Sequence, residues 1–456
     1  MFSYSTSYLA IYFPFGLRVR FISLPLQTVF LGRNFNSMTR QKIEIMSPVG
    51  SYEALYAAIE AGCNSVYFGV EGLNMRSRSA NNFSIDDLRK IASIATEHGV
   101  RSYLTLNTVV YDTEMDYMKS IVRAAKDSGV SAVIAADLSV IQYANEIGLE
   151  VHLSTQCNIT NCEAVRFFSR YADVIVTARE LRLEQVKAIT QWIEQNDVKG
   201  PSGRRLEIEC FVHGALCMAV SGKCYISLDN ANSSANRGAC LQFCRRPYKV
   251  TDMDGGTELM VDNQYIMSPK DLKTLDFLDK VLDAGVRVLK IEGRGRSPEY
   301  VKVVTKVYRQ AVDAWLNGEW NAEKLEQWNK ELSSVYNRGF WDGYYLGRKV
   351  GEWSKGYGSQ ATTKKTFVGT VTNFFKNISV AEIKMETGCL KTGDRIYIMG
   401  ATTGVYEDTL TEIRVDLKQV DKAVKGEMCS IPTKSVVRRS DKVYLIEETN
   451  IGDEEI

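Results

Sequence analysis

The chain lacks several features that would place it in common functional classes. No run of roughly 18 apolar residues occurs, so a membrane-spanning helix is not expected. Its 56 basic and 55 acidic residues nearly cancel, so any contact with nucleic acid must come from a local patch of charge. It has only three histidines, and neither a phosphate-binding P-loop nor a zinc-protease helix motif. A hydrolase active site that pairs a serine or cysteine with a histidine therefore has few positions in the chain where it could be built.

The first 37 residues differ in composition from the rest. They contain Arg18, Arg20 and Arg33 but no acidic residue. Their apolar stretch, residues 8–17, precedes these arginines, whereas a secretory signal places its positive charge first. We expect residues 1–37 to be a disordered extension, or to result from a translation start that was assigned too far upstream. The prediction is a cytoplasmic protein without a membrane partner.

Cysteine is sparse except in one segment. Cys217, Cys224, Cys240 and Cys244 fall within 28 residues, with 6, 15 and 3 residues between successive members. Zinc sites usually pair cysteines across about two to four residues, so the first spacing fits zinc poorly. Four convergent thiolates also suit a 4Fe-4S cluster, which we favour over zinc and over disulfides. If residues 240–244 are helical, their two sulfur atoms project from one face.

Short apolar runs rich in β-branched and aromatic residues recur from residue 42 onward. Most follow a helical pattern that ends in glycine, which favours a left-handed C-cap. The alternation predicts an α/β fold, a (β/α)8 TIM-like barrel over residues 40–296. A doubly wound open sheet is the alternative, but no G-x-G-x-x-G follows the first strand. The expected strands are residues 43–46, 65–70, 101–106, 132–135, 150–154, 174–176, 206–212 and 288–292.

The connection between the seventh and eighth expected strands is unusually long. It contains an insertion, residues 213–262, which carries all four clustered cysteines. Asp254-Gly-Gly256 predicts the turn of a hairpin within it. Because barrel chemistry sits where strands end, we expect the cysteines to lie over the mouth of the barrel.

Polar residues near the predicted strand ends are the remaining site candidates. Arginine offers paired donors to carboxylates and phosphates, although an internal pair between Glu292 and an arginine explains the same residues equally well. His213 precedes Cys217 by four residues and could serve it as a base, or could simply be a hydrogen-bonded residue at a strand end. The catalytic candidates are His213, Glu292 and Arg294. The substrate-binding candidates are Arg76, Arg78, Asn107, Gln156, Arg179 and Arg296.

A change in periodicity marks a second domain. Residues 297–358 are expected to form a helical extension and linker, with helices over 298–317 and 322–332. Residues 361–450 alternate with a period of two and predict a small β-barrel. The run Leu390-Lys-Thr-Gly-Asp394 before a strand resembles the second domain of translation factors, which commonly touches tRNA. The expected strands are residues 367–372, 379–385, 394–399, 409–415, 427–431 and 442–445.

One long motif carries a resemblance to a known family. Residues 209–227, E-C-F-V-H-G-A-L-C-M-A-V-S-G-K-C-Y-I-S, resemble the signature of peptidase family U32. The similarity covers roughly residues 40–350, and the whole chain resembles the bacterial tRNA hydroxylation proteins of that family. Further matching segments are Ser47-Pro-Val-Gly-Ser51, Tyr67-Phe-Gly69, Asn81-Asn-Phe83 and Lys290-Ile-Glu-Gly-Arg294.

This resemblance implies an iron-sulfur protein that hydroxylates the wobble uridine of tRNA to 5-hydroxyuridine, in a prephenate-dependent manner. Cys217, Cys224, Cys240 and Cys244 would hold the 4Fe-4S cluster. Its expected partners are tRNA, prephenate as a small dicarboxylate, and proteins that deliver electrons or iron and sulfur. Two alternatives stay open within the same family: a collagenase-like peptidase and an rRNA hydroxylation protein.

Overall fold

The computed structural model describes residues 43–78, 82–251, 258–259, 265–347, 352–356 and 358–449. These residues belong to one compact unit, residues 39–456. The expected extension, residues 1–37, lies outside the described residues, as do Asn81 and the turn at Asp254-Gly-Gly256.

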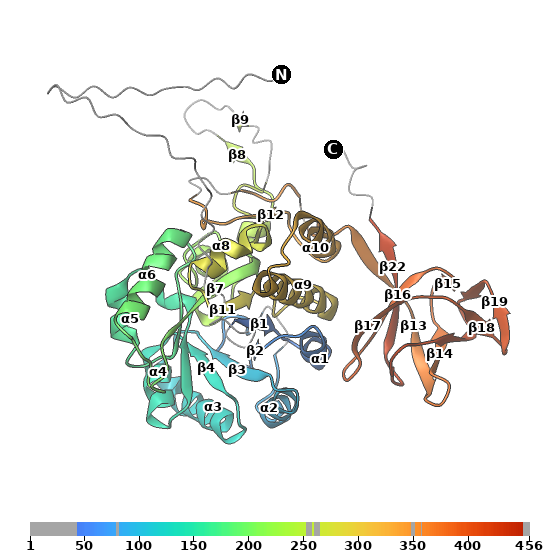
Figure 1. The fold of residues 1–456 in the computed structure, drawn as a ribbon, viewed down its shortest axis with the longest axis horizontal. Helices are drawn as coiled ribbons and strands as arrows, with labels where there is room; N and C mark the ends of the chain where they lie inside the picture. The colour runs from blue at the N-terminus through green and yellow to red at the C-terminus, as the bar shows by residue number, and fades with distance from the viewer. Residues whose placement is uncertain are drawn as a thin grey trace, which may run out of the picture. The chain divides into compact units, whose positions relative to one another are not determined.

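Eight parallel strands close into a barrel, which confirms the predicted fold (Figure 1). Each of the first seven strands pairs with the next, and the eighth, β11, closes the ring by pairing with both β7 and β1. Every strand overlaps its predicted range. The barrel strands are β1 (Glu44–Pro48), β2 (Ser65–Phe68), β3 (Arg101–Leu106), β4 (Ala132–Ala135), β5 (Glu150–Leu153), β6 (Val174–Val176), β7 (Glu207–Gly214) and β11 (Val288–Ile291).

Helices surround these strands and begin and end where the sequence provides caps. Ser51, for example, accepts a hydrogen bond from the Ala54 amide at 3.2 Å and starts the first helix. The glycines after five helices, at positions 62, 99, 129, 148 and 285, all have φ between 68° and 85°, which confirms the predicted left-handed caps. The helices are α1 (Tyr52–Glu60), α2 (Asp87–Glu97), α3 (Met115–Asp127), α4 (Leu138–Glu146), α5 (Cys162–Phe168), α6 (Leu183–Gln195) and α8 (Leu278–Asp283).

A β-bulge in β7 decides which way one predicted site residue faces. Lys290 of β11 pairs with Phe211, but the next residue, Ile291, pairs with His213, so Val212 is the extra residue. Without the bulge, the period of two would place His213 on the same face of the strand as Phe211. The extra residue instead turns His213 outward, toward the helix that follows β11.

The insertion after β7 differs from expectation at its second cysteine pair. Residues 240–242 have no helical structure, Gln242 is left-handed with φ 54°, and only a short 3-10 helix, η6 (Phe243–Arg245), follows. The condition under which Cys240 and Cys244 would share a helix face is therefore not met. The expected hairpin is confirmed by the pairing of β8 (Val250–Thr251) with β9 (Glu258–Leu259). The insertion also contains α7 (Ile226–Ala231) and η5 (Ala235–Arg237).

Two further elements, which the sequence did not suggest, extend the barrel sheet beside β7. The strand β10 (Asp271–Lys273) runs antiparallel to β7, and β12 (Phe340–Trp341) pairs with β10. The helices α9 (Pro298–Asn317) and α10 (Ala322–Ser334) match their predicted ranges closely. The aromatic segment after α10 thus returns to the barrel, where the Tyr345 hydroxyl donates to the Phe211 carbonyl at 2.8 Å.

The C-terminal region is antiparallel and rich in β-strands, as predicted. Eight strands follow one another in the order β17-β16-β22-β13-β14-β21-β18-β19, and β15 pairs separately with β20. The single strand expected over residues 409–415 is wrong, because β17 ends at Thr409 and β18 begins at Ile413. The strands are β13 (Thr363–Phe375), β14 (Val380–Met385), β15 (Cys389–Lys391), β16 (Arg395–Gly400), β17 (Gly404–Thr409), β18 (Ile413–Val415), β19 (Lys418–Val420), β20 (Lys422–Val424), β21 (Met428–Pro432) and β22 (Lys442–Glu448).

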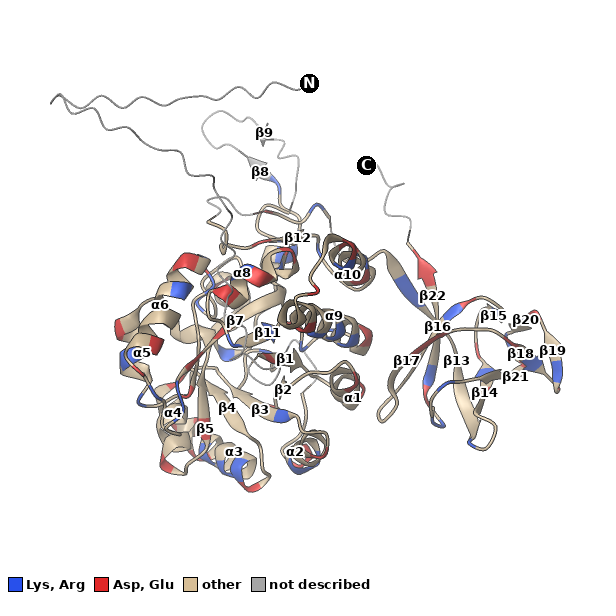
Figure 2. Ribbon diagram, in the orientation of Figure 1, with Lys and Arg blue, Asp and Glu red and all other residues tan. Residues whose placement is uncertain are grey.

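Acidic and basic residues are mixed along the outer helices of the barrel in the view of Figure 2. The formal net charge of the chain is +1. Among the described helices, none is both long and apolar enough to cross a membrane.

Candidate functional site

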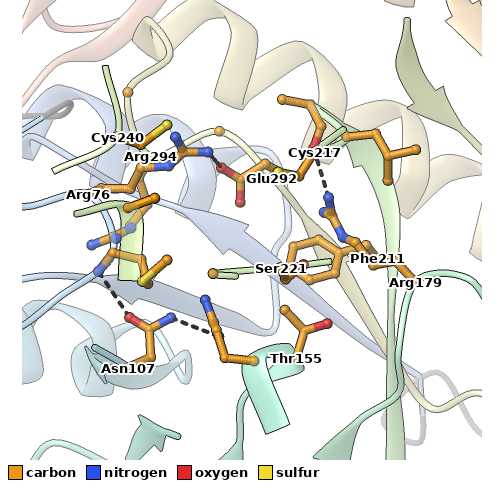
Figure 3. Close-up of a pocket in the computed structure, with 18 of the residues that line it drawn as sticks. Arg76, Asn107, Thr155, Arg179, Phe211, Cys217, Ser221, Cys240, Glu292 and Arg294 are labelled. Carbon is orange, nitrogen blue, oxygen red and sulfur yellow. Dashed lines mark hydrogen bonds and ion pairs between the residues drawn. The ribbon is translucent and has the colours of Figure 1, made fainter. Parts of the chain in front are cut away.

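A cavity of about 260 Å³ opens at the carboxyl ends of the barrel strands, beneath the cysteine-bearing insertion. Strand ends, βα loops and the insertion all contribute to its lining. In Figure 3, Glu292 lies between Cys240 and Cys217, and Asn107 and Thr155 occupy the opposite side of the view. The insertion therefore lies over the barrel mouth, as its position in the sequence predicts.

The structure gathers most of the predicted site residues around this cavity. Arg78 and His213 are the two exceptions. Arg78 is exposed, and its backbone amide donates to the Gly238 carbonyl at 3.4 Å. The predicted residues that line the cavity are Arg76, Asn107, Gln156, Arg179, Cys217, Cys224, Cys240, Cys244, Glu292, Arg294 and Arg296.

Glu292 is the acidic residue of the cavity wall, and it is ionised. Arg76 donates to its carboxylate at 2.7 Å. Burial alone would raise the pKa of Glu292, but the charges of Arg76, Arg179 and Arg294 outweigh it and lower the pKa to about 2. A carboxylate held this firmly in its charged form is a poor general base near neutral pH. The internal Arg-Glu pair considered from sequence is therefore present.

Arg294 is 6 % exposed and is held by neutral partners. It donates to the Thr105 hydroxyl and to the Asn74 side-chain oxygen, each at 3.0 Å. Burial lowers its pKa to about 10, so the guanidinium still carries its charge at neutral pH. Gly69 makes room for it, because a β-carbon at that position would collide with the guanidinium. The glycine in the Tyr67-Phe-Gly69 motif thus has a steric role in shaping the site.

Arg179 also reaches the cavity without a carboxylate contact in the described structure. One of its terminal nitrogens donates to the Ala215 carbonyl at 3.0 Å, and its guanidinium lies 3.8 Å from the centre of the Phe211 ring. Its Nε is buried and has no hydrogen-bond partner. Burial lowers the pKa of Arg179, with the charge of Glu292 opposing this shift. The geometry leaves a cation oriented toward a ligand.

Lys290 is a lining residue that sequence reasoning missed. Its ammonium donates to Glu209 at 2.7 Å inside the barrel and lies 4.8 Å from the centre of the Tyr67 ring. The two side chains are 5 % and 0 % exposed. The signal was available, because Lys290 and Glu292 are two apart on β11 and so share a face of the strand. Other cationic lining residues that were missed are Arg245 and Arg338.

A group of neutral polar side chains lines the opposite side. Asn107 accepts a hydrogen bond from the Met75 amide at 3.2 Å and donates to Gln156 at 3.4 Å. The Ser154 hydroxyl also donates to the Gln156 side-chain oxygen. This wall offers hydrogen bonds without charge, which suits the edge of a planar polar ring.

The four clustered cysteines all line the cavity, but they do not form a site for a single metal ion. Within the described ranges, no three His, Cys, Asp or Glu side chains come close enough to bind one ion. Burial raises the pKa of Cys244, and the charges of Cys217, Cys240 and Cys224 add to this rise against the opposing charge of Arg245. The donor set, four sulfurs, is that of a 4Fe-4S cluster.

The insertion is anchored to the βα loops on which it lies. Arg237 pairs with Glu114 in the loop after β3 and lies 4.1 Å above the Tyr111 ring. Gly238, with φ 77°, approaches the Asn74 carbonyl so closely that a β-carbon would not fit. These contacts fix the cysteine-bearing segment over the mouth.

His213 lies away from the cavity lining. It is 1 % exposed, and the rings around it belong to Tyr300, Tyr308 and Phe340. Burial, followed by the charges of Lys273 and Arg296, lowers its pKa to about 3. His213 is thus a neutral packed residue at physiological pH, and the structure does not pair it with Cys217.

Comparison with known proteins places this site in a family. Residues 50–355 match the sequence profile described as peptidase family U32. The chain belongs to this family. It is 57 % identical over 407 residues to a protein named collagenase from Porphyromonas gingivalis, covering 89 % of this chain and 98 % of the relative.

More distant relatives are named for the hydroxylation of RNA. The tRNA hydroxylation protein P1 of Bacillus subtilis is 30 % identical over 390 residues, or 83 % of this chain and 89 % of that protein. The 23S rRNA 5-hydroxycytidine synthase of Escherichia coli is 33 % identical over 323 residues, or 69 % of this chain and 47 % of that protein. Membership in the family is therefore compatible with more than one activity.

Proposed function

We propose that this U32 protein holds a 4Fe-4S cluster and hydroxylates a pyrimidine base of RNA, with the wobble uridine of tRNA as the leading substrate. The observation that supports this most strongly is the composition of the cavity. Four thiols and an excess of cations face one space, and none of the three histidines, all of which are described, lines it.

The thiols support the cofactor part of the proposal. Cys217, Cys224, Cys240 and Cys244 would hold the cluster. When bound, such a cluster supplies one-electron transfer. Cys217 is the exposed member of the four, so the segment around it is the side from which a partner protein that exchanges electrons with the cluster would approach.

The cations support an anionic co-substrate. Arg179 and Arg294 contact no carboxylate in the described structure, and Glu292 is already paired with Arg76. Replacing C–H by C–OH on a pyrimidine removes two electrons from the base, so the reaction also consumes either water and a two-electron acceptor or an oxygen-atom donor that is itself reduced by two electrons. A dicarboxylate such as prephenate would find paired guanidinium donors here, and the neutral wall of Asn107 and Gln156 would face the base.

Peptide hydrolysis is the second candidate, because the collagenase-named relative is much more similar to this chain than the hydroxylation proteins are. The geometry gives it less support. A cysteine nucleophile needs a nearby base, yet His213 packs among aromatic rings and Glu292 holds a pKa of about 2. A metallopeptidase needs a cluster of ligands for one ion, which the described residues do not provide.

Nucleoside mass spectrometry of tRNA and rRNA from cells lacking this protein tests the proposal. We expect hydroxylated pyrimidines to disappear, and to return with the wild-type chain. The Cys217→Ala variant should not restore them, whereas Cys389→Ala, which removes a partly buried cysteine from the C-terminal β15, should. Purified wild-type protein should contain about four iron and four sulfide per chain, and Cys217→Ala should lose both.

A peptidase assay separates the two candidates. Gelatin and denatured collagen would be incubated with wild-type protein before and after iron removal. Cleavage that survives iron removal, together with unchanged hydroxylated nucleosides in the deletion strain, would reject RNA hydroxylation and support the hydrolase.

A further inference from the structure

A second cavity, of about 530 Å³, adjoins the cysteine cavity. Four residues line both: Cys240, Gln242, Arg245 and Arg338. The two cavities thus share a wall, formed by the segment that bears the second cysteine pair and by the Arg338 side chain. A ligand bound in the first cavity therefore lies next to the second.

The second cavity is lined by three arginines, and none of its described lining residues is acidic. Arg338 is 3.3 Å from Asp271, which lies behind the wall. Arg245 donates to the Ser268 hydroxyl and to the carbonyls of Pro269 and Leu216, all of which are neutral. The charge of Arg245 is therefore held in place without a contacting carboxylate.

Arg246 is the exposed arginine of this group. Its guanidinium lies 4.1 Å above the Phe243 ring, and the structure gives it no carboxylate contact among the described residues. Tyr336, which also lines this cavity, has the guanidinium of Arg296 at 3.7 Å and that of Arg338 at 5.2 Å from its ring centre. Cationic side chains over aromatic rings, along a groove without acidic residues, are typical of surfaces that follow a nucleic-acid strand.

We propose that this second cavity binds backbone phosphates of the RNA strand whose target base enters the first cavity. The inference rests on the proposed function, and it adds a location for the part of the RNA strand that flanks the target base. A base that leaves its stack to reach an enclosed site stays attached to its backbone, so the flanking phosphates must lie beside the opening. The adjoining arginine-lined cavity is a place for them, with Arg246 at its exposed edge.

The test uses full-length protein and the variant Arg246→Gln, which keeps the aliphatic stem and removes the charge. Arg170→Gln is the matched control, because Arg170 is also exposed, also follows an aromatic residue by three positions and lies 6.0 Å from the Phe167 ring. Arg170 precedes β6, at the opposite end of the barrel from the cavities. The probe is a fluorescent RNA hairpin with uridine in its loop, titrated at several salt concentrations.

We expect Arg246→Gln to weaken RNA binding about three- to tenfold and to reduce the slope of log affinity against log salt by about one, the change expected for one lost phosphate contact. Arg170→Gln should bind RNA as the wild type does. Uridine 5′-monophosphate, measured in parallel, should bind equally to both variants and to the wild type.

Two results would overturn the inference. One is wild-type RNA affinity and salt slope in Arg246→Gln. The other is an equal loss of affinity for RNA and for the mononucleotide, which would make the cavity a site for a single phosphate. The nucleoside mass spectrometry tests the proposed function separately. If the protein still hydroxylates RNA and either of these two results is found, only the proposed phosphate-binding role of the second cavity is rejected.

Discussion

The two ends of the barrel both contain carboxylates that are at least partly buried, but the cations around these carboxylates are balanced differently. At the amino end, Glu150 accepts hydrogen bonds from Arg101 at 2.9 Å, Arg204 at 2.7 Å and His152 at 3.1 Å. Burial would raise the pKa of Glu150, but the hydrogen bond and charge of His152 and the charge of Arg101 lower it to about 2. Both arginines of this group, Arg101 and Arg204, thus contact a carboxylate.

At the carboxyl end the cations outnumber the carboxylates. Arg76 is paired with Glu292 and Lys290 with Glu209, while Arg179 and Arg294 are held by carbonyl, hydroxyl and amide oxygens. Holding charge in a buried site without a counterion is costly. The difference indicates that the amino end stabilises the barrel, whereas the carboxyl end keeps positive charge available for a ligand.

The largest expected effect comes from breaking the most buried ion pair among the described residues. Lys290→Met removes the cation that contacts Glu209, whose side chain is 0 % exposed and already has one oxygen without a hydrogen bond. We expect the free energy of unfolding to fall by roughly 3–5 kcal/mol, measured by urea denaturation. The double variant Lys290→Met/Glu209→Gln should recover much of this loss. If the single and double variants are equally unstable, the pair does not act as a unit.

Two histidines, one near each end of the barrel, allow the same contrast to be tested by changing the pH. His152 lies 3.1 Å from Glu150, whereas the charges that act on His213 are those of the cations Lys273 and Arg296. The folded-state pKa of His213, about 3, is below its unfolded value, so its contribution to stability is complete above pH 6.5 and falls as the pH decreases toward 3.

Between pH 6.5 and 5 we expect His213 to account for roughly 2 kcal/mol of lost stability. His213→Asn should reduce the slope of unfolding free energy against pH in that window. His152→Asn, which removes the carboxylate-paired histidine, is the control and should leave that slope closer to the wild type. Identical slopes in all three proteins would contradict the assignment of His213 as a buried neutral residue.

The smallest expected changes in the free energy of unfolding come from replacing one arginine at each end of the barrel, and these two changes should differ in sign. Arg179→Met keeps packing on Phe211 and removes a buried charge that contacts no carboxylate among the described residues, so the free energy of unfolding should be unchanged or rise by about 1 kcal/mol. Arg101→Met removes a partner of Glu150 and should lower it by about 1–2 kcal/mol. Thermal denaturation without ligand measures both. Destabilisation of equal size would mean that the Arg179 charge is compensated in the free protein.

Much of the fold could be predicted from the sequence, because it depends on local patterns. Strand positions follow from runs of apolar residues, and helix ends follow from glycines such as Gly62 and Gly129, which the structure finds in left-handed conformations. The expectations that the structure did not meet also came from local patterns. Residues 240–244 look helical by spacing alone, but Gln242 adopts a left-handed conformation. Residues 409–415 look like one strand, but two strands occupy that region.

The candidate site was predictable only in part. Strand-end residues such as Asn107, Gln156 and Glu292 could be chosen because the carboxyl ends of parallel strands meet on one side. His213 was misplaced because a single extra residue, Val212, reverses which side of β7 the following side chain faces. The bulge depends on the pairing of β7 with β11, about 80 residues away, which no local pattern encodes.

The sequence by itself determined the alternation of strands and helices, the concentration of four cysteines in one insertion and the family signature, since each is a matter of spacing along the chain. Only the tertiary structure decided which charges compensate one another. Barrel closure brings β7 and β11 together, so Glu209 pairs with Lys290. It also leaves the loop cations facing a cavity, where Arg179 contacts a carbonyl and no carboxylate among the described residues. Charge balance in a buried site depends on distance in space, and distance in sequence does not set it.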